Sequence, residues 1–483
     1  MSPLSIIIII SSYFIILLCI SYFTGRKADN AGFFLGNKKS PWYVVSFGMI
    51  GASLSGVTFI SVPGWVGATQ FSYMQMVLGY LAGYFFIANI LMPLYYRLNL
   101  TSIYTYLEQR FGIYSYKTGA SFFLLSRIIG ASFRLFLVSN VLQITVFNEW
   151  NIPFAVTVVI TILLIWLYTF KGGIKTIIWT DSLQTFFMLL AIGFSVYFIS
   201  DALNFNIKDL ANAVSESKLS KIFFFDDWRD KRFFFKQFFS GAFITIVMTG
   251  LDQDMMQKNL SCRNIKDAKK NMYWFSIVLV PVNLLFMSLG VLLFIYANKN
   301  GIDIPAQSDD LFPIIATKGF LKPIVAIFFI LGLIAAAYSS ADSALTALTT
   351  SFTVDILNTK NLKEKELRKT RKNVHILFSF ILMITILLFK AINNESVISA
   401  IFTVAGYTYG PLLGLYSFGL FTKYNVKDKF VPIIAIVSPV ICYIINSYSQ
   451  LWFNGYQFSF ELLILNGIIV FIGLLVISKK AKA

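Results

Sequence analysis

A row of hydroxyl side chains lies within a long apolar segment of the chain. In the stretch AAAYSSADSALTALTT, the residues Ala336, Ser339, Ser340 and Ser343 are three or four positions apart, so they share one face of a helix. Hydroxyl and carbonyl oxygens can coordinate a small monovalent cation without a full negative charge. Close packing is the alternative, because alanine and serine also let membrane helices approach one another. The pattern favours a cation site, to which an interrupted helix would contribute backbone carbonyls.

Charged side chains within the apolar segments are the second chemical signal. Such charges are costly in a membrane, and they usually face a cavity. They are Arg127, Arg134, Asp181, Asp252, Asp254 and Asp342. Carboxylates around a central cavity suit a cation, whereas the arginines suit an anionic or polyhydroxy group. For Arg134 the alternatives are an ion pair with an aspartate of the 236–257 segment, or a side chain that reaches the membrane surface.

Membrane helices must position these residues. The chain is 57% hydrophobic and only 13% charged, whereas soluble domains are about 25% charged. Apolar runs of about 20 residues, each long enough to cross a bilayer, recur along the chain, and we count thirteen. We therefore expect an all-α polytopic membrane protein. Its single transmembrane domain (1–483) divides into an extra N-terminal helix (4–24), two repeats (42–199 and 236–420) and C-terminal helices (430–478).

The distribution of basic residues predicts the topology of these spans. Lysine and arginine number 27 in the loops on one side and about three in the short loops on the other, so the net charge of +17 is a topology signal. Nucleic-acid binding is therefore not expected. Because basic loops stay in the cytoplasm, we expect the N-terminus outside and the C-terminus inside, in the plasma (cytoplasmic, or inner) membrane.

Two predicted spans, the second and the seventh, are interrupted. They contain GMIGASLSGVTFISVPGWVG and SGAFITIVMTGLDQDMMQ, in which glycine and proline weaken the helix and free backbone carbonyls. Inside a membrane, free carbonyls are tolerated where they line a cavity. The two interruptions are five spans apart, which is the spacing of two inverted five-helix repeats. Glycine is also simply common in membrane helices, but the matched spacing favours the repeats.

An enzyme is not expected from the sequence. It contains no nucleophile–base pair with a histidine partner, no phosphate-binding GxxxxGK[ST] loop and no Rossmann fingerprint.

Four stretches resemble the sodium:solute symporter family, which includes sodium/glucose, proline, sialic-acid, choline and iodide carriers. They are TSIYTYLEQRFG, GGIKTIIWTDSLQ, GLDQDMMQKNLSCRNIKDAKK and AAAYSSADSALTALTTSFTVDI. The resemblance covers nearly the whole chain. It implies a leucine-transporter-like fold of two inverted five-helix repeats, with Na+ as the coupling ion.

The resemblance also implies sodium ligands. The main sodium site would use the backbone carbonyls of Gly51, Leu54 and Ala336 and the hydroxyls of Ser339 and Ser340. A second sodium site would use Asp181 with Ser339, Asp342 and Ser343. The sialic-acid branch has serine where this chain has Asp342, which leaves sodium, a proton or an ion pair open at that position.

The residues implied for solute binding lie on the interrupted spans and the spans around them. They are Ser53, Ser55, Thr58, Gln75, Arg134, Met248, Thr249, Asp252, Gln253 and Thr403. Arginine at 134 or 127 would favour an acid, because one guanidinium binds one carboxylate through two hydrogen bonds.

The expected function is sodium-coupled symport of a small polar organic solute by alternating access, in a functional monomer embedded in the lipid bilayer. A sugar, sialic acid or another sugar acid is the favoured solute. The alternatives are an amino-acid or choline-type carrier, and a non-transporting solute sensor on the same scaffold.

Overall fold

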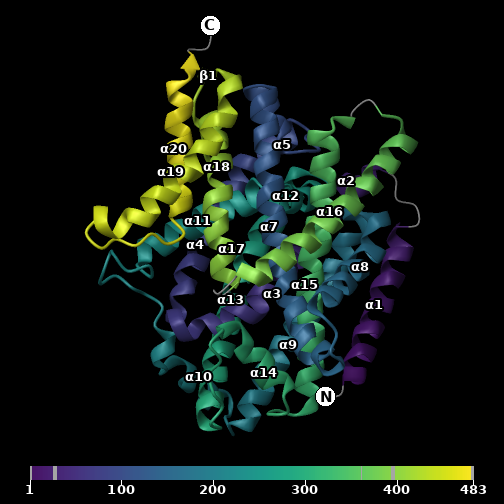
Figure 1. Cartoon of the computed structure of the whole chain (residues 1–483), viewed down its shortest axis with the longest axis vertical. Coiled ribbons are helices and arrows are strands. Elements are labelled where there is room, and N and C mark those ends of the chain that lie inside the picture. The colour runs from purple at the N-terminus through teal and green to yellow at the C-terminus, as the bar shows by residue number, and fades with distance from the viewer. Residues whose placement is uncertain (1–2, 26–29, 360–361, 393–396, 480–483) are drawn as a thin grey trace.

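The computed structural model of the chain describes residues 3–25, 30–359, 362–392 and 397–479, and it is almost entirely helical (Figure 1). Eight helices in these ranges are long and apolar enough to cross a membrane, or ten if each of two bent pairs counts as one span. The stretch Trp42–Arg97 covers two predicted spans, and two further apolar helices, Phe154–Leu167 and Leu462–Val476, are shorter. The all-α membrane architecture is confirmed, and the count of thirteen spans stays a prediction.

Long apolar runs form helices here because a helix satisfies its own backbone hydrogen bonds where water is absent. The helices of the first half are α1 (Pro3–Gly25), α2 (Asn30–Leu35), α3 (Trp42–Thr69), α4 (Tyr73–Phe86), α5 (Met92–Arg97), α6 (Thr105–Arg110), α7 (Ile113–Thr145), α8 (Phe154–Gly172) and α9 (Ile174–Ala202). Short 3-10 or π segments join several of them: η1 (Gly36–Lys38), η2 (Gln70–Ser72), η3 (Ile87–Leu91) and η4 (Phe147–Trp150).

The second half of the chain is also helical. Its helices are α10 (Ile207–Ser215), α11 (Phe234–Thr245), α12 (Gln253–Leu260), α13 (Ile265–Lys299), α14 (Leu311–Thr317), α15 (Pro323–Ser351), α16 (Glu364–Ile392), α17 (Val397–Thr408), α18 (Gly410–Phe421), α19 (Val431–Trp452) and α20 (Leu462–Val476). The short segments are η5 (Lys218–Ser220), η6 (Ile246–Gly250), η7 (Ser308–Asp310), η8 (Phe352–Ile356) and η10 (Asp428–Phe430). Two short strands, β1 (Asn425–Val426) and β2 (Ser478–Lys479), pair antiparallel, with Asn425 opposite Lys479.

The helix α3 breaks at Ser55, as the glycine-rich sequence predicts. Ser55 has φ 52° and ψ 174°, a left-handed backbone conformation that non-glycine residues rarely adopt. The last four carbonyls of a helix have no partner within it, so a helix that ends at Leu54 frees the carbonyls of 51–54. Gly51 brings this segment against α9: a Cβ there would lie 2.2 Å from Thr185 Oγ1. The break therefore lies beside a close contact between α3 and α9.

The predicted interruption in the seventh span is also present, and a third was not expected. The helical segment Phe234–Gly250 and α12 meet at 65°, after the π-helical segment η6. The unexpected bend, of 46°, separates α17 from α18 at Tyr409. Both bends end helices inside the protein, so both leave polar backbone groups beside the central packing.

The broken helix α3 lies at the centre of the packing. The helix α3 packs against α9, α13 and α15, and α15 packs against α7 and α9 as well. The helices α10 and α14 lie at one end of the long axis, near the start of α1, while α2, α5 and β1 lie toward the other end (Figure 1). The basic loops of the sequence therefore gather at the end that holds α2 and β1.

Candidate functional site

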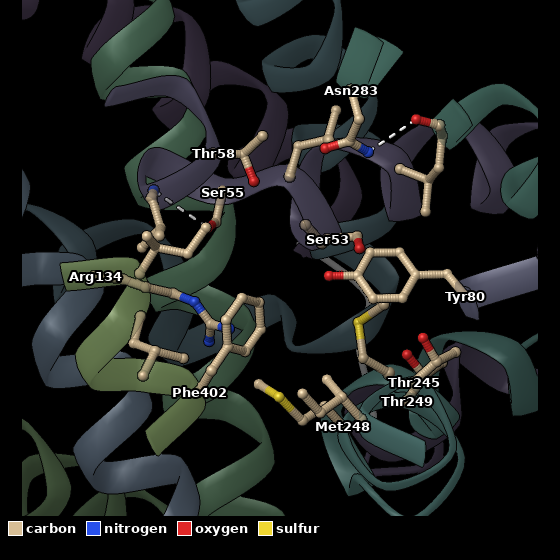
Figure 2. A pocket seen from close by; sticks show the side chains of 18 of the residues that line it. Ser53, Ser55, Thr58, Tyr80, Arg134, Thr245, Met248, Thr249, Asn283 and Phe402 are labelled. Atoms are coloured by element: carbon tan, nitrogen blue, oxygen red, sulfur yellow. Dashed lines mark hydrogen bonds between the residues drawn. The ribbon is translucent and has the colours of Figure 1, made fainter. Parts of the chain in front are cut away.

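A cavity of about 90 Å³ lies beside the break in α3 (Figure 2). Helices from both halves of the chain line it: α3, α4 and α7 from the first, and α11 to α13 and α17 from the second. Its walls mix hydroxyl, amide and guanidinium groups with apolar side chains. This composition is typical of sites that bind a polar organic molecule, in which a few polar groups orient the ligand.

Six of the residues predicted to bind the solute line this cavity. They are Ser53, Ser55, Thr58, Arg134, Met248 and Thr249. The serines and Thr58 come from the break itself, where the backbone turns their side chains toward Arg134 and Tyr80 (Figure 2).

Gln75 lies elsewhere, although it is buried on α4. Its amide nitrogen donates to the backbone carbonyls of Arg232, at 2.8 Å, and Ser72, at 3.3 Å. Its amide oxygen accepts from the backbone N–H of Phe224 at 3.1 Å. The structure thus engages both ends of this amide in holding the 221–233 segment, and Gln75 is not among the cavity-lining residues.

Asp252 and Gln253 lie at the next break, outside the cavity. The Oδ1 of Asp252 caps α12 by accepting from the backbone N–H of Asp254 at 2.9 Å, and its Oδ2 accepts from the phenol of Tyr409 at 2.5 Å. Gln253 donates to the carbonyl of Thr101 at 2.9 Å and accepts from the N–H of Ile103 at 3.0 Å. Neither side chain lines the cavity.

Thr403 lines a different, larger cavity of about 440 Å³. This second cavity is bounded by polar and basic groups that include Arg232, Gln237 and Asn446. Phe402 borders both cavities, so its ring separates them. We call the two the central cavity and the vestibule.

Several residues of the central cavity were not predicted. They include Tyr80, Tyr84, Thr245, Asn283 and Phe402. Asn283 had a signal in the sequence, because it is an amide within the apolar helix α13. Its Nδ2 donates to the carbonyl of Leu279 at 2.8 Å, while its buried Oδ1 has no hydrogen-bond partner among the residues that the structure describes. Phe402 had no signal, since one more phenylalanine in an apolar helix carries no information about its neighbours.

The charge of the central cavity is positive. Arg127 pairs with Asp254 and lies 3.9 Å from Asp252 Oδ2. Arg134 has no ion pair within the described residues, and its Nε is buried without a hydrogen-bond partner. No described aspartate or glutamate lines the cavity. A buried, unpaired guanidinium is costly, so this cavity favours a ligand that brings a negative charge.

The residues predicted for the main sodium site lie where α3 faces α15, which packs against it. Ser339, Ser340 and Ala336 are all buried on α15, and Ser340 Oγ lies 3.4 Å from the carbonyl of Ala336. Gly51 and Leu54 precede the break, so their carbonyls are among those that the α3 helix leaves without partners. Neutral oxygens from two helices suit a monovalent cation, and the donor set fits sodium.

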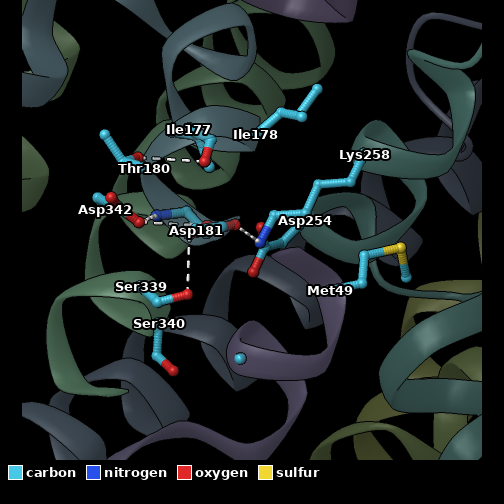
Figure 3. A network of polar contacts seen from close by, with 12 residues as sticks. Met49, Ile177, Ile178, Thr180, Asp181, Asp254, Lys258, Ser339, Ser340 and Asp342 are labelled. Carbon is cyan, nitrogen blue, oxygen red and sulfur yellow. Dashed lines mark hydrogen bonds and ion pairs between the residues drawn. The ribbon is translucent and has the colours of Figure 1, made fainter. Parts of the chain in front are cut away.

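Asp181, one of the residues predicted for a second sodium site, has a lysine as its neighbour. Asp181 lies in the interior on α9, where its Oδ2 is 2.7 Å from Lys258 Nζ and its Oδ1 accepts from Ser339 Oγ at 2.8 Å (Figure 3). Asp342 is buried as well, and its Oδ1 accepts from the backbone N–H of Ser343 at 2.5 Å. An ammonium from α12 therefore pairs with the oxygen of Asp181 that does not bond Ser339, and nothing in the sequence of α12 indicates this contact.

Comparison of the sequence with known proteins finds a match to one family. The sequence profile of the sodium:solute symporter family matches residues 33–428. The sodium/sialic acid symporter NanT of Aliivibrio fischeri is 24% identical over 449 residues, covering 87% of this chain and 83% of the relative. The sodium/sialic acid symporter SiaT of Proteus mirabilis is 25% identical, covering 90% and 88%.

Solved structures carry the same fold. A Na+-coupled sialic acid symporter in a substrate-bound outward-open state superimposes with a TM-score of 0.82 at 21% identity, covering 98% of this chain and 99% of that one. The nucleobase-cation-symport-1 family transporter MHP1, closed around bromovinylhydantoin, gives a TM-score of 0.57 at 11% identity, covering 92% and 94%.

Proposed function

The chain belongs to the sodium:solute symporter family, and from that premise we propose that it imports a sugar acid of the sialic-acid type together with sodium. Symporters of this family are transporters rather than enzymes, and the many apolar helices make this one a multi-pass membrane protein. The similarity to NanT and SiaT supports the sialic-acid class.

The observation that carries the proposal is Arg134. Its guanidinium lines the central cavity without an ion pair among the described residues, in a cavity that has no described carboxylate of its own. A carboxylate on the solute would satisfy it through two charge-assisted hydrogen bonds. The solute is thus the missing anion of a buried pair.

The rest of the cavity suits the polyhydroxy body of such a solute. Hydroxyl groups of Ser53, Thr58, Tyr80 and Thr249 line the same cavity as Arg134 (Figure 2). The Oδ1 of Asn283, which has no hydrogen-bond partner among the described residues, lines it too. Hydroxyls both donate and accept hydrogen bonds, so they match sugar hydroxyls in either role.

A second candidate, an amino acid, would also present a carboxylate to Arg134. Its ammonium would need acceptors of its own, and no described carboxylate lines the cavity to receive it. A choline-type cation would add a positive charge beside Arg134, which the same charge balance disfavours. The sugar acid therefore remains the proposed solute.

Sodium would bind between α3 and α15, with the carbonyls of Gly51, Leu54 and Ala336 and the hydroxyls of Ser339 and Ser340 as ligands. A cation there would stabilise the conformation in which α3 packs on α15. Because solute residues such as Ser53 and Ser55 belong to the same break, sodium would also orient the solute site. This shared segment is the physical basis of the coupling.

Release of the solute into the cytoplasm would require the contacts between the central cavity and the basic loops to separate. They are the Tyr409–Asp252 hydrogen bond and the Arg127–Asp254 ion pair, which join α7, α12 and the α17–α18 bend. On the vestibule side, Phe402 is the one described residue that borders both cavities. Movement of Phe402 would open the solute path outward, and loss of the contacts made by Asp252 and Asp254 would open it inward.

The orientation follows from charge. The loops that hold 27 lysines and arginines would face the cytoplasm, which puts the N-terminus outside and the C-terminus inside. The repeats at 42–199 and 236–420, the bilayer around them and a functional monomer complete the proposal.

The test is a comparison of two sugars on the purified protein. We expect N-acetylneuraminate, in the presence of sodium, to raise the thermal midpoint of the wild type, and N-acetylmannosamine, which lacks the carboxylate, to leave it unchanged. Arg134→Gln should lose the response and Arg134→Lys should retain part of it, with Arg97→Gln, outside both cavities, as the control. Equal responses to both sugars would refute recognition of the carboxylate.

A further inference from the structure

Two opposite charges meet in the interior between α9 and α12. Lys258 Nζ lies 2.7 Å from Asp181 Oδ2, and each side chain is only 1% exposed (Figure 3). Apart from this ion pair, Lys258 Nζ has no hydrogen-bond partner within the part of the chain that the structure describes. A lysine buried in this way must keep a counter-charge, and Asp181 provides it.

The other oxygen of Asp181 is engaged too. Its Oδ1 accepts from Ser339 Oγ at 2.8 Å, and the amide of Gln184, in the orientation that satisfies both its groups, donates to the same oxygen at 3.2 Å. Each carboxylate oxygen therefore has a positively polarised partner. A sodium ion at Asp181 would have to displace the ammonium or share the carboxylate with it.

We propose that Lys258 acts as a tethered cation in place of a second sodium ion, so that this symporter couples its solute to one sodium. The proposal rests on the sodium-coupled function proposed above. The pair of Lys258 and Asp181 is neutral as it stands. A sodium ion on the same carboxylate would be repelled by the ammonium beside it, whereas replacing Lys258 by a neutral residue would leave Asp181 without this counter-charge.

The chain positions the ammonium through the break in the seventh span. Asp252 ends the bend and caps α12, so α12 starts beside the central cavity and runs against α15 and α9. Lys258 lies in the last turn of α12, from which its side chain reaches Asp181. A tethered ammonium has a high effective concentration at this carboxylate, which a free ion must exceed.

The main sodium site between α3 and α15 can still bind its ion when Lys258 takes the place of a second sodium. Its proposed oxygens are the carbonyls of Gly51, Leu54 and Ala336 and the hydroxyls of Ser339 and Ser340. Ser339 Oγ donates its proton to Asp181 Oδ1 and keeps its lone pairs for the ion, and Ser340 Oγ lies beside the carbonyl of its own helix. One sodium can therefore bind between α3 and α15 while Lys258 stays at Asp181. Each transport cycle would then move one fewer positive charge than a cycle with two sodium ions, and the maximal solute gradient would depend less steeply on sodium.

The experiment counts sodium ions on the full-length purified protein without solute. Equilibrium binding of radioactive sodium, with choline chloride holding the ionic strength constant, should give one ion per wild-type molecule and two for Lys258→Gln. The rise in thermal midpoint per tenfold increase in sodium should roughly double in Lys258→Gln, because stabilisation scales with the number of ions bound. Lys266→Gln, an exposed lysine on the adjacent α13, is the matched control and should bind one.

The double variant Asp181→Asn/Lys258→Gln removes both charges and should return to one ion. Two ions on the wild type, or one ion on a folded Lys258→Gln, would overturn the proposal. If Lys258→Gln does not fold, the wild-type count still decides. A wild type that binds no sodium would instead contradict the sodium coupling of the proposed function, so the two failures are distinguishable.

Discussion

The phenol of Tyr409 donates a hydrogen bond of 2.5 Å to the carboxylate of Asp252, and each residue lies at a helix break. Tyr409 lies at the bend between α17 and α18, and Asp252 begins α12 after the bend in the seventh span. One hydrogen bond therefore joins two bends that would have to move apart for the cavity to open toward the basic loops.

Tyr409→Phe should weaken this closure. Loss of the phenol hydroxyl removes a hydrogen bond to a buried carboxylate, which lowers the free energy of unfolding by about 1–3 kcal/mol. We expect a lower thermal midpoint and faster efflux of preloaded N-acetylneuraminate from proteoliposomes. Tyr407→Phe is the matched control, since it removes a phenol two residues away that accepts only from Asn446. Unchanged efflux with normal folding would argue against a closing role for Tyr409.

Ser340→Ala should weaken sodium binding without abolishing folding. Loss of one neutral oxygen ligand is expected to raise the half-saturating sodium concentration roughly tenfold, or about 1.4 kcal/mol. Sodium titration of the thermal midpoint measures the change. Thr385→Ala on α16 removes a similar helix-bonded hydroxyl away from the site, and its sodium response should equal that of the wild type. A sodium response in Ser340→Ala that matches the wild type would remove this residue from the main site.

Phe402→Ala should join the central cavity to the vestibule. The ring borders both cavities and is 8% exposed, so truncation opens a path for the bound solute. We expect a shorter residence time and an affinity for N-acetylneuraminate lower by about tenfold, which is about 1.4 kcal/mol. Phe380→Ala, on the outward face of α16 and 57% exposed, should bind as the wild type does. Unchanged dissociation kinetics would mean that Phe402 does not close the cavity.

Asp309, in the short segment η7 outside the spans, should make stability depend on pH. Burial raises the pKa of its carboxyl from about 3.8 to about 6. Because the folded state binds this proton more tightly than the unfolded state, the contribution is present below about pH 4. It is lost as the pH rises through about 6, and it amounts to about 3 kcal/mol.

Asp309→Asn should therefore flatten the pH dependence of the thermal midpoint and raise the midpoint near neutral pH. The backbone N–H of Val397, which now donates to Asp309 Oδ2 at 3.0 Å, can still donate to the amide oxygen. Asp303→Asn, an exposed acid in the same connection, is the control. A pH profile of Asp309→Asn that is parallel to the wild-type profile would assign the dependence to other groups.

The sequence predicted the broken spans well because glycine and proline act locally. A backbone that turns at Ser55 needs little from distant residues, so its neighbours along the chain reveal it. The hydroxyl face of α15 is predictable for the same reason, since helical spacing alone puts Ser339 and Ser340 together. The bend at Tyr409 is not evident from the sequence, because Gly410 and Pro411 are also compatible with a continuous membrane helix.

Contacts between helices could not be predicted from the sequence. The sequence around Lys258 does not indicate burial, yet Lys258 is buried against Asp181, because α12 turns inward after Asp252. Thr403 was expected in the solute site, but the neighbouring Phe402 faces the central cavity, since one residue rotates a helix by about 100°. Which face of a helix contacts which neighbour depends on packing, and a single sequence does not show how the helices pack.

The central claim is sodium-driven accumulation of a sugar acid, and transport by purified wild-type protein in proteoliposomes tests it most directly. With sodium outside, potassium inside and an inside-negative potential, we predict that N-acetylneuraminate accumulates transiently above its equilibrium level. Replacing external sodium with choline should abolish that accumulation. Equal uptake in choline, or uptake that never exceeds equilibrium, would contradict sodium-coupled symport of this solute.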